Sequence, residues 1–415
     1  MIDRAAAFVV LAGLAGCGGA GRPAPAPAPP APAPGVPLVD LTALAPDADA
    51  DADADAAPVD LATSLGNHRV VLAPVAVSWP TDRRLAQFHA IGGGSGWSTA
   101  IAVSADGSTP VGMARATGGF EEAVRWRDGT MSPLGTLDLA GDDRSTAWAV
   151  SRDGDTVVGE STATETSSVP VVWRGAAAPA ALTLPPGVDS GQAHAVSRDG
   201  TIIAGCGTGN CDLALRWRDD VPAIVDTERP FRLAAHSMSE DGAAIAGTVG
   251  DQPGEAIRVT TRAVDRRGPG SVVEAISDDG TIMVGNLGPK PVLWRGKAVT
   301  ELGLLPGYDA CYARAVAADG GRVVGNCTRA STWTPRASDD RTPPPADPHA
   351  SVAFVWDRRT GMRSVADALA AAKVVLPASW WLDEAFDICG YGVTIVGNGR
   401  SPSTASEAWM VILPR

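Results

Sequence analysis

One position varies in chemistry within an otherwise uniform repeat. Seven segments contain a version of Ala-Val-Ser-x-Asp-Gly, and the residue just before Ala-Val-Ser differs between most of them. It is Ile101, Trp148, His194, His236, Glu274, Arg314 and Phe386. Imidazole, carboxylate and guanidinium groups beside an indole ring can bind an anion, a sugar or a metal ion. Trp148, His194, His236, Glu274 and Arg314 are therefore a candidate ligand site, and a solvated channel lining is the alternative.

The repeat also predicts the elements that position these residues. Its copies include AIAVSADGSTPVG (100–112), AWAVSRDGDTVVG (147–159) and AHAVSRDGTIIAG (193–205), and further copies follow to residue 397. Asp-Gly between two β-favouring runs predicts a hairpin with a type I′ turn, which needs positive φ at both positions. The aspartates of these turns are thus expected to shape the turn rather than to catalyse.

Two more strands complete each unit. A third strand ends in Trp at positions 126, 173, 217, 294 and 356, and these rings are expected to lie in the core. Leu-rich runs at 134–137, 182–184 and 301–305 predict the fourth strand. Four antiparallel strands per unit of roughly 40–45 residues is the blade size of a β-propeller. The sequence predicts an all-β, seven-bladed propeller. The strand-like segment 84–93 is expected to complete the last blade and so close the ring.

The repeat pattern resembles that of a known group of exported proteins. Ala-Val-Ser-x-Asp-Gly, followed by Val-Gly, a Trp-ending strand and Leu-Gly-x-Leu, is similar to the HAF repeats of bacterial extracellular proteins. The last segment, LPASWWLDEAFDICGYGVTIVGNG, resembles the usual end of that family. The resemblance implies an exported repeat architecture over about residues 86–415 and assigns no catalytic residue.

The first residues predict export and lipid attachment. A short apolar stretch ends in Leu14-Ala15-Gly16-Cys17, which resembles the bacterial lipobox. We expect cleavage before Cys17, acylation of Cys17, and attachment to a membrane, with the outer membrane favoured because Gly18 follows the cysteine. An ordinary secretory signal is the alternative. Whether the protein is periplasmic or surface-exposed stays open.

Composition divides the rest of the chain. Residues 1–17 are the expected signal peptide, and the Pro/Ala-rich and Asp/Ala-rich segment 18–62 is an expected disordered linker. Residues 63–83 form a strand-like segment of uncertain role, which is a candidate for an additional outer strand. Residues 84–415 form the predicted propeller.

The remaining cysteines fit an oxidising compartment. Cys311 and Cys327 flank a predicted hairpin, and Cys206 and Cys211 bracket a Gly-rich loop, so both pairs are candidate disulfides. Cys389 is left over and is expected to be buried. No CxxC pair with a nearby histidine is visible in the sequence, so no metal site and no cofactor are predicted.

Charge and missing motifs limit the function. A net charge of −13 argues against a nucleic-acid partner. No nucleophile elbow, HExxH or phosphate loop is present in the sequence. We predict a monomeric, lipid-anchored, non-catalytic binding module of the cell envelope, with a glycan or a protein as ligand on the loop face. A polysaccharide hydrolase or lyase with its site at the channel mouth is the alternative.

Overall fold

The computed structural model describes the chain from residue 74 onward, with short gaps. The described residues are 74–80, 82–93, 96–116, 119–137, 144–164, 167–207, 211, 213–225, 233–250, 254–329, 350–404 and 406–415. The predicted signal peptide, Cys17 and the predicted linker 18–62 lie outside the described residues.

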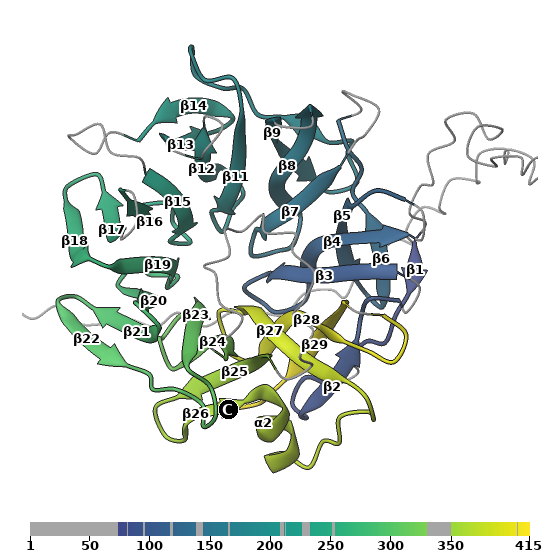
Figure 1. Cartoon of the computed structure of the whole chain (residues 1–415). Coiled ribbons are helices and arrows are strands. Elements are labelled where there is room, and N and C mark those ends of the chain that lie inside the picture. Colours follow the sequence, from purple (N-terminus) through teal and green to yellow (C-terminus); the bar gives the residue numbers. More distant parts are fainter. Residues whose placement is uncertain are drawn as a thin grey trace, which may run out of the picture. The chain divides into compact units, whose positions relative to one another are not determined.

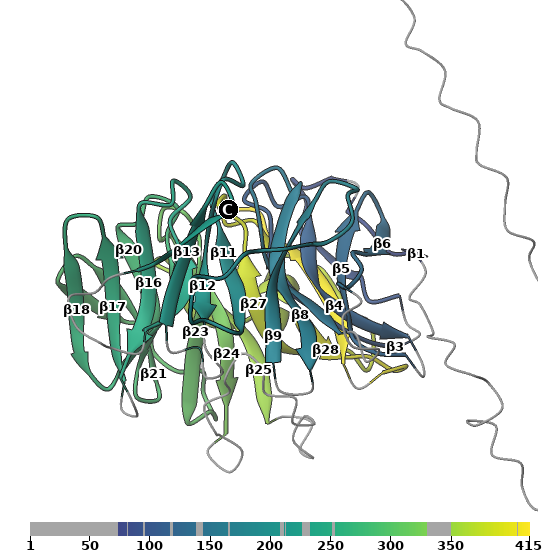
Figure 2. The ribbon, with the colours of Figure 1, turned by 90° about the horizontal axis from the view of Figure 1, so that it is seen from above.

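In the described part of the chain, the strands form seven antiparallel sheets, the predicted blades, arranged as a ring (Figure 1). Blade 1 contains β3 (Gly96–Val103), β4 (Pro110–Ala116), β5 (Glu122–Arg127) and β6 (Thr130–Pro133). Blade 2 contains β7 (Ser145–Val150), β8 (Thr156–Thr164), β9 (Ser167–Arg174) and β10 (Ala180–Ala181). Blade 3 contains β11 (Gly191–Val196), β12 (Ile202–Gly207), β13 (Leu213–Arg218) and β14 (Val221–Ile224). Blade 4 contains β15 (Leu233–Met238), β16 (Ala244–Val249), β17 (Glu255–Thr260) and β18 (Val264–Pro269). Blade 5 contains β19 (Ser271–Ile276), β20 (Ile282–Leu287), β21 (Lys290–Arg295) and β22 (Ala298–Glu301). Blade 6 contains β23 (Ala310–Val316), β24 (Arg322–Thr328), β25 (Ser351–Asp357) and β26 (Gly361–Ser364). Seen from the side in Figure 2, the strands run through the thickness of the ring.

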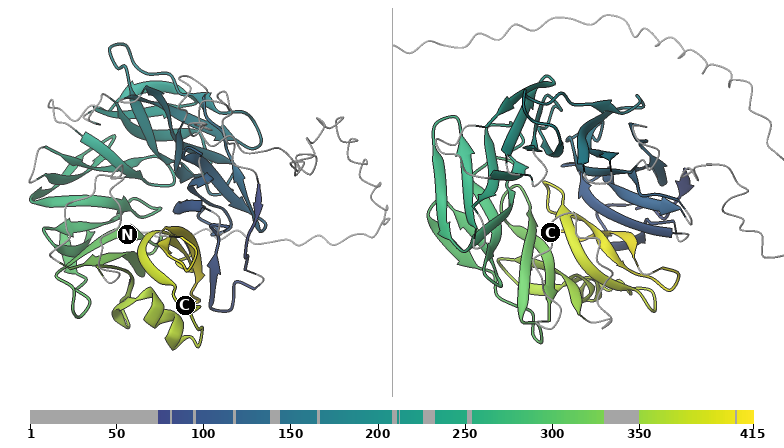
Figure 3. Two further views of the ribbon diagram at one scale, coloured as in Figure 1. Left: turned by 45° about the vertical axis from the view of Figure 1, so that its right-hand side comes forward. Right: turned by 45° about the horizontal axis from the view of Figure 1, so that its top comes forward.

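The two ends of the described chain meet in the seventh blade. This blade contains β27 (Trp381–Ile388), β28 (Thr394–Arg400) and β29 (Glu407–Ile412), and its fourth strand is β2 (Gln87–Ala90) from the other end. Gln87 pairs with Ile412 and Ala90 with Trp409, so the predicted closure by an N-terminal strand is confirmed (Figure 3). Closure leaves no free edge between the first and last blades.

The segment before β2 adds one strand to the first blade. In β1 (Val75–Ala76), Val75 pairs with Met131 of β6, which makes this blade five-stranded. The segment 63–83, whose role the sequence left uncertain, thus supplies an outer strand.

The predicted type I′ turn is wrong for the inner hairpin. In the inner turn of blade 3, Gly200 has φ +74 and donates its N–H to Ser197 O, but Asp199 is not among the residues with positive φ. Gly200 is therefore the last residue of a four-residue turn, whose shape the Asp199 side chain fixes by accepting hydrogen bonds from Ser197 Oγ (2.7 Å) and Thr201 N (3.1 Å). Positive φ at both turn residues occurs instead between the third and fourth strands of blade 1, at Asp128 (φ 51) and Gly129 (φ 77).

The predicted position of the fourth strand is also wrong. The structure begins that strand directly after the two-residue turn, at Thr130 in blade 1 and at Ala298 in blade 5, before the Leu-rich runs that were predicted to form it. In the loops that follow, Leu182, Leu302 and Leu305 of those runs are buried in the core, whereas Leu304 is exposed. Their hydrophobicity reflects burial rather than strand pairing.

The core lies within and between the blades. Trp126, Trp173, Trp217 and Trp294 are at most 1% exposed and Trp356 is 8% exposed, as predicted for core packing. The described residues also include a short helix, α2 (Val365–Ala371), capped by Ser364, whose hydroxyl accepts from Asp367 N. No helix in the described part of the chain is long and apolar enough to cross a membrane.

Candidate functional site

The innermost strand of every blade contains a β-bulge at the same place. Between Ala193 and Ala195 of β11, for example, the pairing with β12 shifts by one residue, and His194 is the extra residue. In the other blades the extra residue is Ile101, Trp148, His236, Glu274, Arg314 and Phe386. We call these seven the bulge residues. All seven are half-buried. The position that varies in the sequence is thus a residue that the sheet does not pair in any of the seven inner strands, and β27 has a second bulge at Asp383.

In six of the seven blades, the glycine that follows Val or Ala on the second strand makes room for the bulge. A Cβ on Gly205 of β12 would lie 2.0 Å from Gln192 O and 2.9 Å from Ala193 Cα. A Cβ would lie 1.8–2.0 Å from an inner-strand carbonyl oxygen at Gly112, Gly159, Gly285, Gly325 and Gly397. Only glycine allows the bulged backbone to approach this closely.

Two bulge residues form an aromatic pair. The rings of Trp148 and His194, from neighbouring blades, lie 5.8 Å apart between centroids at an interplanar angle of 80°. His194 Nε2 also lies 2.9 Å from Gln192 Oε1. Trp148 Nε1 is buried and has no hydrogen-bond partner within the described part of the chain.

Two further bulge residues form an ion pair, and a third, His236, interacts electrostatically with both. Arg314 Nη1 donates to Glu274 Oε2 at 3.3 Å, and both side chains are about one-fifth exposed. Although burial opposes it, the charges of Glu274 and Glu384 raise the pKa of Arg314, which keeps the guanidinium charged. Burial lowers the pKa of His236; the charge of Glu274 offsets part of this and that of Arg314 adds to it. Arg314 Nε has no acceptor among the described residues.

The structure therefore brings the five candidate residues together in two groups. Trp148 contacts His194, while Glu274 contacts Arg314 and both influence His236. The two remaining bulge residues, Ile101 and Phe386, are apolar, so the ring of bulge residues has a polar arc and an apolar arc.

Sequence reasoning missed a second ring, at the inner turns. The residue x of Ser-x-Asp-Gly joins one blade to the next through backbone hydrogen bonds, from Arg152 N to Arg198 O, from Arg198 N to Glu240 O and from Glu240 N to Asp278 O. Arg152 also donates to Tyr391 Oη at 2.7 Å, which links the second blade to the seventh. The signal was available, because position x varies between copies as much as the bulge position does.

Salt bridges join the side chains of this second ring across the end of the propeller where the inner turns lie. Glu240 accepts from Arg198 Nε at 2.7 Å and forms a 3.3 Å ion pair with Arg152, two blades away. Asp278 lies so close to Gly390 that a Cβ on that glycine would be 2.8 Å from Asp278 Oδ2. Side chains from blades that are not neighbours therefore meet at this end.

Two carboxyl groups near this end are held in an unfavourable environment for a charge. Burial raises the pKa of Asp278 to about 6, and the nearby charge of Glu240 adds to the effect. Burial raises the pKa of Asp387 to about 7, although its carboxyl accepts hydrogen bonds from Val103 N and Ile388 N, both at 2.8 Å. The first of these bonds joins the seventh blade to the first.

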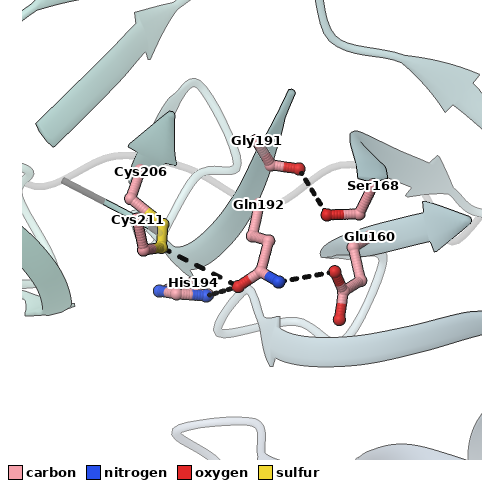
Figure 4. Close-up of a disulfide and its surroundings, with 7 residues drawn as sticks. All are labelled: Glu160, Ser168, Gly191, Gln192, His194, Cys206 and Cys211. Carbon is pink, nitrogen blue, oxygen red and sulfur yellow. Dashed lines mark hydrogen bonds between the residues drawn. A yellow bond between two sulfur atoms is a disulfide. The ribbon is translucent and has the colours of Figure 1, made fainter. Parts of the chain in front are cut away.

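The cysteines form two disulfides in the structure, Cys206–Cys211 and Cys311–Cys327. Cys389 is free and buried, as predicted. The sequence shows no histidine near the first pair, but the hairpin of β11 and β12 brings His194 to it (Figure 4).

Comparison with known proteins identifies the fold and not the family. No protein-family model matches the sequence, and a search of curated proteins finds no match. The HAF-repeat resemblance stays a prediction from the repeat pattern.

Several solved structures are similar to this chain. A chain from work on two prolyl endopeptidases has a TM-score of 0.50 and 12% identity, over 80% of this chain and 51% of that one. A putative TolB from Agrobacterium tumefaciens has a TM-score of 0.38 and 15% identity, over 77% of this chain and 91% of that one. The β-propeller domain of Myceliophteria thermophila Cps50 (Swd1) has a TM-score of 0.45 and 11% identity, over 75% and 96%. At these identities the first similarity supports the fold alone, and the other two carry no argument.

Proposed function

We propose that this protein is an exported, lipid-anchored propeller that acts as a non-catalytic binding module of the cell envelope. The observation that carries the proposal is that all seven inner strands are bulged at one position, and that this position holds indole, imidazole, carboxylate, guanidinium and apolar side chains in different blades. A residue needed only for packing would be expected to be similar in each blade.

The ligand is expected to be rich in hydrogen-bond acceptors. Trp148 Nε1 and Arg314 Nε are buried donors that no group in the described part of the chain accepts. Buried donors without an acceptor are rare in folded proteins and are commonly satisfied by water or a ligand. Sugar hydroxyls and peptide carbonyls both supply such acceptors, and an indole ring beside them adds a stacking surface.

The ligand is expected to approach from the loop face. At the turn face, Arg152, Glu240 and Tyr391 make contacts across the axis between blades that are not neighbours. The loops that join the fourth strand of one blade to the first strand of the next lie at the opposite end of the strands, where access is not limited by these contacts.

Binding can be tested directly on the full chain carrying Cys17→Ser. Panels of cell-envelope glycans, peptidoglycan fragments and peptides should yield one ligand class that binds. Arg314→Met and Trp148→Phe should each weaken it by about tenfold, the effect of losing one good hydrogen bond. Arg266→Met is the matched control: it removes a salt bridge from Arg266 of the outer strand β18 to Glu255 of β17, and it should leave affinity unchanged. Equal affinity in all variants would contradict the proposed site.

The alternative, a polysaccharide hydrolase or lyase, makes a different prediction. Incubation with polysaccharides would then release new reducing ends or unsaturated sugars, and Glu274→Gln would stop the release. The pairing of Glu274 with Arg314 favours binding over acid–base catalysis, because the carboxylate is held by a cation. Product formation by the wild type that Glu274→Gln abolishes would replace the binding proposal.

The proposed membrane attachment rests on Leu14-Ala15-Gly16-Cys17 and agrees with an oxidising compartment, in which two disulfides persist. Mass spectrometry of the membrane fraction should find an acylated peptide that begins at Cys17. A Cys17→Ser form that still carries acyl chains would contradict the attachment.

A further inference from the structure

Three metal-ligating side chains lie together in the third blade. His194 comes from β11, Cys206 from β12 and Cys211 from just before β13, and one ligand atom of each lies within 4.8 Å of the others (Figure 4). Cys206 is buried, whereas His194 and Cys211 are half-buried. No other group of this kind occurs among the described residues.

An oxygen atom that could serve as a fourth ligand is oriented toward His194 and Cys211. Gln192 Oε1 lies 2.9 Å from His194 Nε2 and 3.9 Å from Cys211 Sγ. Its amide nitrogen donates to Glu160 Oε2 at 2.7 Å, and this bond turns the amide oxygen toward the histidine and the cysteine. A carboxylate that orients a ligand from behind is a usual feature of metal sites.

We propose that Cys206, Cys211 and His194 form a Zn²⁺ site when the two cysteines are reduced, with Gln192 Oε1 or water as the fourth ligand. Two thiolates and one imidazole are a ligand set that Zn²⁺ takes in proteins, with tetrahedral geometry. In the disulfide the sulfur atoms are not thiolates, so the oxidised pair does not bind the ion.

The chemistry balances with one external reagent. A dithiol reductant transfers two electrons and two protons to the Cys206–Cys211 bond and becomes a disulfide itself. Each of the two thiols then loses its proton as Zn²⁺ binds, so two protons are released for each ion.

The second disulfide shows why the first is the reducible one. Cys311 and Cys327 are both 0% exposed and face each other directly across β23 and β24. Cys211 is half-buried, and its φ of +58 lies in a region that residues other than glycine rarely adopt. The Cys206–Cys211 bond also spans only 5 positions against 16, so it restricts the unfolded chain less. We therefore expect a reductant to cleave the Cys206–Cys211 disulfide before the Cys311–Cys327 disulfide.

Metal binding is a separate property from the proposed binding of a glycan or a peptide, and it can be tested without any organic ligand. His194 belongs to both, since its ring contacts Trp148 and its nitrogen faces Gln192. Metal binding would consequently fix the imidazole at one end of the polar arc.

Cobalt provides the direct test. The full chain with Cys17→Ser, reduced under anaerobic conditions and freed of reductant, should take up one equivalent of Co²⁺ and show thiolate-to-cobalt charge-transfer and tetrahedral d–d absorption. Zn²⁺ should displace the Co²⁺. His194→Ala should weaken binding by about tenfold or more, an effect at least as large as that of losing an orienting residue. Cys206→Ser/Cys211→Ser should abolish the thiolate bands.

The matched control is Cys311→Ser/Cys327→Ser, which removes the other pair and should leave the cobalt spectrum unchanged. If the Cys206/Cys211 variant fails to fold, alkylation of the wild type decides, because Zn²⁺ should protect Cys206 and Cys211 from modification. A reduced wild type without thiolate–cobalt bands, the same affinity in His194→Ala, or a disulfide that is reduced only on unfolding would each overturn the proposal.

Discussion

The inner hairpin of each blade contains a turn that is nearly the same around the ring and a bulge residue that differs between most blades. In blade 3, Ser197, Asp199 and Gly200 form the turn, and His194 is the bulge residue only three positions earlier. The turn is held by its own side chains and by contact with the preceding blade, where a Cβ on Gly200 would lie 2.4 Å from Thr156 Oγ1. The bulge residue is unpaired by the sheet. Residues that build the ring are therefore constrained, and the unpaired bulge residues are free to differ.

Substitution of a glycine behind a bulge should have the largest effect. Gly205→Ala would place a methyl group 2.0 Å from Gln192 O, a backbone atom that cannot rotate away. We expect the free energy of unfolding in urea to fall by about 3 kcal/mol or more. Gly187→Ala is the control, because its φ is +84 but nothing lies within 4 Å of the added Cβ, and it should cost about 1 kcal/mol. Equal losses would show that the bulge does not require this glycine.

The next effect is a pH dependence of opposite sign in two sets of aspartates. Burial raises the pKa of Asp387 from 3.8 to about 7 in the folded protein, so its ionisation opposes folding. The wild type should lose stability relative to Asp387→Asn as the pH rises from about 4 to about 7. Denaturation of both proteins across this range measures the difference, and a constant offset from the altered hydrogen bonds to Val103 and Ile388 does not affect its slope. Parallel curves would contradict the prediction.

A turn aspartate should behave in the opposite way and with a smaller effect. The hydrogen bond from Ser197 holds the pKa of Asp199 below its ordinary value, so the stability it provides is present above about pH 4 and is lost as the pH falls through the lowered folded-state pKa. Asp199→Ala should cost about 1 kcal/mol at pH 7, measured in urea. Glu301→Ala, which removes an exposed salt bridge to Lys290, is the control and should cost less than about 0.5 kcal/mol.

Substitution of a bulge residue itself should have the smallest effect on stability. Ile101→Thr changes a half-buried side chain that packs in no strand pair, and the free energy of unfolding should move by no more than about 0.5 kcal/mol. Ala100→Val, one residue earlier and fully buried, should cost about 1–3 kcal/mol because the core has no room for two more methyl groups. A large loss in Ile101→Thr would mean that the bulge residues serve packing after all.

The sequence alone determined the repeat, the number of blades, closure by the N-terminal strand and the position of the variable residue. Each of these depends on local chemistry or on repetition: the Asp-Gly turn, the alternating strands and the seven copies are visible residue by residue. The fourth strand was predicted in the wrong place because hydrophobic leucines in a loop resemble a strand. The type I′ turn was predicted for the wrong hairpin because both hairpins of blade 1 contain Asp-Gly.

Only the tertiary structure decided which side chains meet. Arg314 reaches Glu274 and His194 reaches Trp148 because neighbouring blades place equivalent bulges side by side. His194 lies beside Cys206 and Cys211 because the β11–β12 hairpin folds twelve residues of sequence back on themselves. Arg152 meets Tyr391 across the axis because the ring closes. Periodicity in a sequence fixes what repeats, whereas contacts between different repeats depend on the curvature of the whole ring.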